Sequence, residues 1–187
     1  MIHSVKFTCV LDTNVIYPLW IRDLLMWFAY YELYTPKWSR NIFDEWISVM
    51  QRKGIDELEA LRRADKMNLA FPDALVQNYE PLIDSLKLPD VNDRHVLAAA
   101  IKTNADLIIT NNLKDFPGDY LLSFGLKAKA PDVFFTDIID LNHDLSVQAF
   151  KRLVLTKKNP PLDEYDVLDI FRKNGLTDTA NYLHALL

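Results

Sequence analysis

The sequence has few of the residues that build disulfide-rich, zinc-binding or linker-rich proteins. Its 187 residues include one cysteine, four glycines and nine prolines. A single thiol excludes an intramolecular disulfide and a cysteine-paired zinc or redox centre, and the scarcity of glycine argues against collagen-like or low-complexity chains. Because Cys9 lies in an apolar run, we expect it to be a small buried hydrophobe.

The chain also lacks long apolar runs and an excess of positive charge. No apolar stretch reaches the roughly 18 residues of a membrane span, and residues 1–11 lack the apolar segment of a signal peptide. We therefore expect a cytoplasmic protein with no membrane partner. The 21 Lys and Arg against 26 Asp and Glu give a net charge of −5, which by itself disfavours nucleic-acid binding through a generally basic surface.

What is present is a hydrophobic pattern typical of one sizeable core. With 50% hydrophobic residues, a chain of this length should bury about 70% of its unfolded surface. The pattern predicts strands at 4–11, 33–35, 106–110 and 126–135, and helices at 18–34, 39–50 with Ser39 as cap, 55–70 and 90–101.

This order of elements predicts an α/β fold with a parallel sheet. Residues 141–187 predict helices only, interrupted at 159–161 and near Gly175. We therefore expect two parts, a sheet domain over 1–140 and a helical C-terminal extension over 141–187.

Acidic residues recur where such a fold would gather them. Asp12 ends the first strand, Asp93 begins a buried helix, and Asp115 lies in the turn after the strand at 106–110. Steps of 100° along the helix at 39–50 place Glu45 at the edge of the apolar face and Asp44 nearly opposite. Ligands of parallel sheets bind beyond the carboxyl ends of the strands, so four distant acids could meet in one cleft.

Such a cluster needs a counter-charge, because two carboxylates 4 Å apart repel by about 4 kcal/mol at an effective dielectric constant of 20. Oxygen ligands favour Mg²⁺ or Mn²⁺, which supports metal-assisted hydrolysis of a phosphate ester. Two divalent ions would change the net charge from −5 to −5 + 4 = −1, so the acidic balance does not exclude a polyanionic substrate.

Each acid taken alone also has a structural interpretation. Asp12 and Asp115 would also suit turns, and Glu45 would suit an ion pair at the edge of its helix. Asp90, three residues before Asp93, resembles a helix N-cap, and we interpret it as structural.

Four segments together resemble the PIN-domain family of metal-dependent ribonucleases, which includes the VapC-type toxins of toxin–antitoxin modules. They are V-L-D-T-N-V at 10–15, F-D-E-W at 43–46, D-V-N-D-R-H-V-L-A-A-A at 90–100 and D-L-I-I-T-N-N-L-K-D-F at 106–116. The resemblance covers about residues 4–140. It implies a three-layer α/β fold, a parallel sheet with helices on both faces. It also implies an acidic pocket that binds Mg²⁺ or Mn²⁺ and cuts RNA.

The resemblance also implies a ligand set. Asp12, Glu45 and Asp93 match the first three acids of the family, whereas Asn112 stands where some members have Asp. Either Asn112 or Asp115 completes the site. An asparagine there would remove one negative charge and weaken the binding of a second metal ion. Both a one-metal site and a two-metal site are therefore compatible with the sequence.

The neighbours of these acids suggest supporting roles. Thr13 and Asn14 are candidates to orient the first acid, and Thr110 is a candidate to support the metal-bound water. Arg94 and His95 would either contact a substrate phosphate or act as charge partners within the fold.

One basic segment stands apart from the acids. Residues 147–158 contain Lys151, Arg152, Lys157 and Lys158 and no acid, which suits either contact with an RNA backbone or the solvated face of a helix. The helices of 160–187 would pack on the domain, form a homodimer contact or dock an antitoxin protein.

The sequence thus predicts a metal-dependent endoribonuclease with an RNA substrate, and the family resemblance alone implies that it acts as the toxin of a toxin–antitoxin pair. One alternative is a catalytically inactive PIN module that binds RNA or protein. The other is a haloacid-dehalogenase-like phosphohydrolase, which we disfavour because Asn14 occupies the place of its second Asp.

Overall fold

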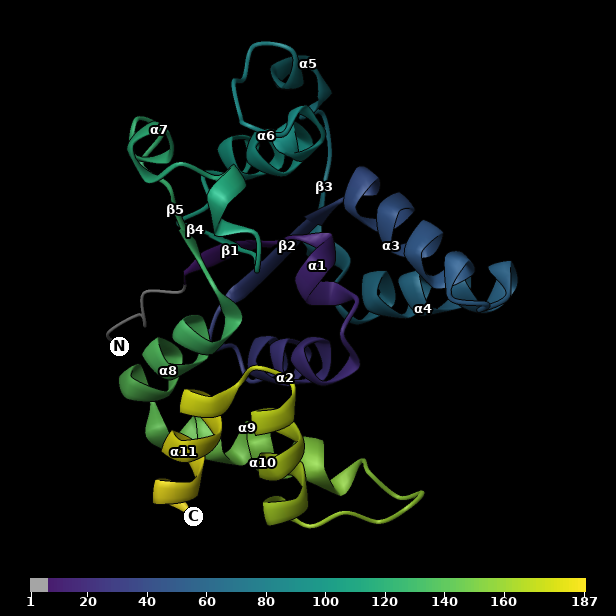
Figure 1. Cartoon of the computed structure of the whole chain (residues 1–187), viewed down its shortest axis with the longest axis vertical. Coiled ribbons are helices and arrows are strands. Elements are labelled where there is room, and N and C mark those ends of the chain that lie inside the picture. Colours follow the sequence, from purple (N-terminus) through teal and green to yellow (C-terminus); the bar gives the residue numbers. More distant parts are fainter. Residues whose placement is uncertain (1–6) are drawn as a thin grey trace. The chain divides into compact units, whose positions relative to one another are not determined.

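The computed structural model describes residues 7–187, which form two compact units. The sheet unit comprises residues 7–17 and 35–129, and the helical unit comprises residues 18–34 and 130–187. Figure 1 shows the strands of the first unit and the bundled helices of the second. Residues 4–6 of the first predicted strand lie outside the described residues.

The sheet unit is built on five parallel strands. Their order is β3-β2-β1-β4-β5, and every neighbouring pair is parallel. This arrangement confirms the predicted α/β class with a parallel sheet. The strands are β1 (Thr8–Leu11), β2 (Thr35–Ser39), β3 (Leu75–Val76), β4 (Leu107–Ile109) and β5 (Lys127–Lys129).

Helices of the same unit connect and cover these strands. The Ala-rich helix α6 contacts β1, β2 and β4, and its residues from His95 to Ala100 are all buried. This confirms the prediction of a helix surrounded by protein. The helices of this unit are α1 (Thr13–Ile16), α3 (Arg40–Arg52), α4 (Glu57–Ala70), α5 (Glu80–Ile83), α6 (Arg94–Lys102) and α7 (Gly118–Leu122).

The helical unit packs around aromatic side chains. Phe28 meets Phe135 edge to face with ring centroids 5.4 Å apart, and Phe150 meets Phe171 at 5.8 Å. In this unit α2 contacts α9, and α11 contacts α8 and α10. Its helices are α2 (Leu19–Tyr30), α8 (Pro131–Leu141), α9 (His143–Leu155), α10 (Glu164–Lys173) and α11 (Thr177–Leu186).

The breaks in the C-terminal helices are where the sequence predicts them. The chain leaves α9 before Pro160 and Pro161, and it turns at Gly175 with a positive φ of 81° between α10 and α11, a conformation that glycine adopts without strain. Among the described residues, no helix has the length and apolar character needed to cross a membrane.

Two predicted strands are wrong in position. The strand expected at 33–35 begins only at Thr35, because Glu32 turns with a positive φ of 57° and the Leu33 amide still bonds the Phe28 carbonyl at the end of α2. The strand expected at 126–135 ends at Lys129. Helix α8 begins at Pro131, whose fixed φ suits a first helical position.

Candidate metal centre

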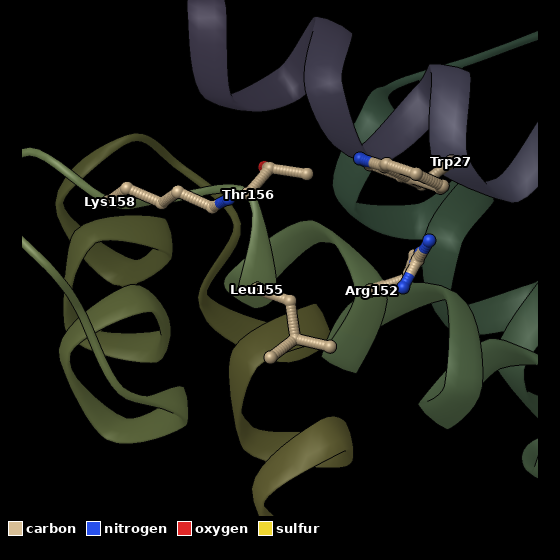
Figure 2. A pocket seen from close by; sticks show the side chains of 5 residues that line it. All are labelled: Trp27, Arg152, Leu155, Thr156 and Lys158. Carbon is tan, nitrogen blue, oxygen red and sulfur yellow. The ribbon is translucent and has the colours of Figure 1, made fainter.

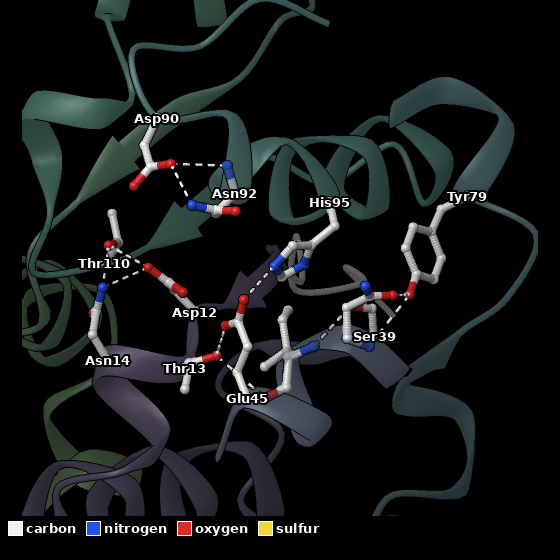
Figure 3. A network of polar contacts seen from close by, with 12 residues as sticks. Asp12, Thr13, Asn14, Ser39, Glu45, Tyr79, Asp90, Asn92, His95 and Thr110 are labelled. Carbon is white, nitrogen blue, oxygen red and sulfur yellow. Dashed lines mark hydrogen bonds and ion pairs between the residues drawn. The ribbon is translucent and has the colours of Figure 1, made fainter. Parts of the chain in front are cut away.

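The carboxyl ends of β1 and β4 hold the first part of the site. Because Leu11 is in register with Ile109, the next residues, Asp12 and Thr110, lie side by side. Asp12 is only 4% exposed. Its Oδ2 accepts hydrogen bonds from Thr110 Oγ1 at 2.7 Å and from Asn14 Nδ2 at 2.5 Å (Figure 3). The carboxylate is thus fixed in one orientation.

The same side chains tie the turn after β4 to the start of α1. Asn14 Oδ1 accepts a hydrogen bond from the Asn111 amide at 2.8 Å, and Thr110 Oγ1 accepts one from the Asn112 amide at 3.0 Å. Asn14 therefore contacts Asp12 as its predicted role requires. The Thr13 hydroxyl does not, since it donates to Glu45; Thr13 hydrogen-bonds Asp12 through its backbone.

Helix α3 carries the second acid. Ser39 caps this helix as predicted, because its hydroxyl accepts a hydrogen bond from the Ile42 amide at 3.3 Å. Asp44 points outward into an exposed ion pair with Arg40. Glu45, one residue on, reaches inward from α3 toward His95 and Asp12 (Figure 3). The predicted orientation of this acidic pair is confirmed.

Glu45 is held by two partners from other elements. Thr13 Oγ1 donates to its Oε2 at 2.5 Å, and His95 Nε2 lies 2.8 Å from its Oε1. Burial alone raises the pKa of Glu45, but the hydrogen bonds from His95 and Thr13 and the attraction by His95 outweigh it, so the net pKa is lowered. Glu45 is therefore a stable carboxylate. His95 is its hydrogen-bond partner within the fold.

Three further carboxylates lie close together near the N-terminus of α6. Asp90, Asp93 and Asp115 each place a carboxylate oxygen within 4.8 Å of the others. Asp90 also caps the short 3-10 helix Val91–Asp93, because its Oδ1 accepts a hydrogen bond from the Asn92 amide at 2.8 Å. Asn112 Nδ2 donates to Asp115 Oδ2. Asn112 thus contacts the carboxylate of Asp115 at this end of the sheet.

The acidic side chains in this region affect one another's pKa values. Burial and the charges of Asp12, Asp90, Asp115 and Glu45, in that order, raise the pKa of Asp93 to about 6. Burial is also the main reason that the pKa of Asp12 is raised, and the Glu45 charge adds to it. The acids from distant parts of the sequence therefore share one electrostatic environment.

The donor set fits a hard divalent cation. Asp93 Oδ2 is buried and has no hydrogen-bond partner among residues 7–187, although Asp90 and Asp115 lie beside it. An unpaired buried carboxylate oxygen is unfavourable in a metal-free protein. Mg²⁺ and Mn²⁺ bind through such carboxylate oxygens, so Asp93 with Asp90 and Asp115 could hold one.

Arg94 and Asp90 are the remaining residues near the acids that the sequence singled out. Arg94 has a buried Nε without a hydrogen-bond partner in the described part of the chain, and no contact defines its role. Asp90, which the sequence interpretation treated as structural alone, both caps a helix and belongs to the acidic group. Its spacing of three residues from Asp93 was the available signal.

Comparisons with known proteins agree with this geometry. Residues 8–114, more than half of the chain, match the family model described as PIN domain, and residues 131–185 match that of the VapC50 C-terminal domain. A Mycobacterium tuberculosis (strain ATCC 25618 / H37Rv) protein named "Putative ribonuclease VapC50" is 40% identical over 77 residues, which are 41% of this chain and 46% of that protein.

The aligned segment thus spans less than half of that relative. No solved structure matches the chain. The match over residues 8–114, together with the parallel sheet and the acids at its carboxyl edge, leads to one conclusion: the chain belongs to the PIN-domain family.

Proposed function

We propose that the protein is a divalent-metal-dependent endoribonuclease that acts as the toxin of a toxin–antitoxin module. The observation that carries this proposal is the buried, unpaired Asp93 Oδ2 beside the carboxylates of Asp90 and Asp115. The similarity to a protein whose name includes ribonuclease supports the choice of RNA as substrate.

In the proposed site, Asp93, Asp90 and Asp115 would hold Mg²⁺ or Mn²⁺, and Asp12 and Glu45 would add negative charge around it. An ion of this kind would lower the pKa of a bound water and polarise a phosphoryl oxygen. The hydrogen bonds to Asp12 and Glu45 hold their carboxylates in place before substrate arrives, and such preorganisation is a main source of catalytic power.

We assign Asp115 rather than Asn112 as the residue of this turn that completes the site. Asp115 contributes an oxygen to the acidic group, and Asn112 uses its side-chain amide to bond Asp115. Thr110 is assigned to orient Asp12, since its hydroxyl donates to that carboxylate. The number of ions that the site holds is an outcome of the metal titration proposed below.

We also propose an organisation and partners for the chain. A nuclease domain over residues 1–140 with a helical extension over 141–187 remains our proposal, as do an antitoxin protein and a homodimer as partners. An RNA substrate would place the activity in the cytoplasm. Membership of the PIN-domain family disfavours the haloacid-dehalogenase-like alternative, whereas an inactive PIN module remains an outcome of the test.

The test is cleavage of a panel of end-labelled single-stranded and structured RNAs by the full chain. We expect cutting with Mg²⁺ or Mn²⁺ and none with EDTA. Asp12→Asn and Asp93→Asn should lose the activity, while Asp44→Asn, which alters an outward acid of α3, should keep it. If no RNA in the panel is cut by the parent protein, or if Asp93→Asn cuts equally fast, the nuclease proposal is wrong.

A further inference from the structure

The helical unit has a hollow of its own, away from the acidic residues in sequence. It measures about 460 Å³ and is lined by Trp27 of α2 and by Arg152, Leu155, Thr156 and Lys158 at the end of α9. Figure 2 shows Trp27 facing Arg152, with Lys158 on the other side of Thr156. This volume lies within the range of about 300–1,000 Å³ that small ligands occupy.

The charge around the hollow is positive and unpaired. Residues 145–162 contain no Asp or Glu, and Lys151, Arg152 and Lys158 are exposed. None of these three makes an ion pair within residues 7–187. Lys157 differs, because it pairs with Asp23 and lies 4.5 Å above the Trp20 ring. Two of these cations, Arg152 and Lys158, line the hollow and are available to a ligand.

The hollow also presents apolar and aromatic surface. Trp27 is half-buried and packs edge to face against Tyr30 with ring centroids 5.4 Å apart. Tyr30 is 69% exposed and Leu155 is 65% exposed. A half-buried indole beside unpaired cations suits single-stranded nucleic acids, because bases stack on aromatic rings while phosphates neutralise the cations.

We infer that this hollow binds a nucleotide of a single-stranded RNA, with the base against Trp27 and a phosphate beside Arg152 and Lys158. The inference rests on the proposed RNA substrate and adds a second contact to it, outside the bond that is cut. A nucleotide site here would also offset the electrostatic repulsion between the chain and RNA. A chain with a net charge of −5 and an acidic centre repels RNA, and a local group of cations supplies the attraction.

A protein partner is the less favoured occupant. An acidic peptide would also be attracted to Arg152 and Lys158. The hollow is nevertheless of small-ligand size, which suits one base with its phosphate better than the long groove that a partner helix requires.

The experiment measures binding of a 12-nucleotide, fluorescein-labelled, mixed-sequence single-stranded RNA to the full chain by fluorescence anisotropy, with EDTA to prevent cleavage. We expect Trp27→Ala to weaken binding about tenfold and Trp27→Phe to restore most of it. The double variant R152Q/K158Q should weaken binding and reduce the slope of log affinity against log salt by about 1.4, since each contact contributes about 0.7 for single strands.

Lys173→Gln is the matched control, because it removes one exposed cation from α10 of the same unit; it should change binding less than twofold. Thermal melting checks that each variant folds, and the exposed positions of R152Q/K158Q keep the test valid if Trp27→Ala is unstable. Equal binding by parent, R152Q/K158Q and the control would overturn the inference. The inference would also be overturned if the variants bound RNA as the parent does but no longer bound an acidic peptide. That result would assign the hollow to a protein partner.

The two proposals fail separately. If the parent binds the RNA through these residues but cuts no RNA with Mn²⁺, the nuclease function fails and the nucleotide site stands. If the parent cuts RNA while R152Q/K158Q and Trp27→Ala bind and cut it equally well, only the nucleotide site fails.

Discussion

Thr110 Oγ1 donates a 2.7 Å hydrogen bond to Asp12 Oδ2 across 98 positions of sequence. The two residues follow adjacent parallel strands whose last residues, Leu11 and Ile109, are in register. The sheet register therefore places a hydroxyl donor beside the first acid of the site. Any change that weakens this bond should affect both the fold and the charge of Asp12.

Thr110→Val tests this bond. Valine keeps the shape of the fully buried threonine but leaves Asp12, Asn14 Nδ2 and the Asn112 amide each without one partner. The free energy of unfolding should therefore fall by about 1–3 kcal/mol. Thr110→Ser keeps the hydroxyl and should lose less, through its missing methyl group alone. Urea denaturation of both variants gives the comparison, and equal losses would show that the hydrogen bond contributes little.

Asp93→Asn should stabilise the metal-free protein at neutral pH. The raised pKa of about 6 for Asp93 means that the folded chain binds its proton more tightly than the unfolded chain. The stabilisation that comes from protonated Asp93 is thus complete below pH 4, and it is lost as the pH rises through 6. Melting in EDTA should show parent and variant alike near pH 4. At pH 7 the variant should melt higher, by roughly 2–4 °C if the gain is about 1 kcal/mol.

The reverse order at pH 7, with the parent melting higher, would contradict this reading of the acidic group. Asp44→Asn serves as the control, because its carboxylate is exposed and belongs to an i,i+4 pair with Arg40. Exposed pairs of this kind contribute about 0.3–0.5 kcal/mol, so this variant should melt slightly lower than the parent at pH 7.

Cleavage should decline as the pH falls through about 6. Protons and the divalent ion compete for the Asp93 carboxylate, whose pKa is raised to about 6 by burial and by the neighbouring acids. A higher Mn²⁺ concentration should therefore move the midpoint of the pH profile to lower pH. Initial rates measured from pH 5 to 8 at two Mn²⁺ concentrations check this, and a midpoint that does not move with metal would count against proton–metal competition.

Asp90 has two roles that substitution can separate. Its Oδ1 caps the turn before α6, and its charge lies beside Asp93 and Asp115. Asp90→Asn keeps a good capping side chain, so it should retain stability and weaken metal binding. Asp90→Ala should also weaken metal binding, and it should lose about 1 kcal/mol of stability because the cap is removed. Calorimetric Mn²⁺ titration with parallel melting distinguishes the two, and unchanged metal affinity in Asp90→Asn would restrict Asp90 to the cap.

The sequence predicted the site best where local periodicity decides the direction of a side chain. Helical steps of 100° were enough to separate inward Glu45 from outward Asp44. The position of Asp12 followed from its place after a buried strand. Local patterns could not reveal that Thr13 bonds Glu45 through its hydroxyl, because that contact joins elements 32 residues apart.

Strand boundaries were harder to predict because short strands carry little signal. Strand β3 has only two residues and was not predicted. Leu33 was assigned to a strand although its amide completes the turn after α2. Asp90 was assigned one role from its capping pattern, and only the folding of the turn at Asp115 toward it reveals the acidic group.

Titration of the full chain with Mn²⁺ measures whether the acids that the fold gathers form a cation site. The parent and Asp44→Asn should bind Mn²⁺ with equal affinity, whereas Asp93→Asn should bind at least about tenfold more weakly. Equal Mn²⁺ affinity in Asp93→Asn and Asp44→Asn would show that Asp93 does not belong to a cation site.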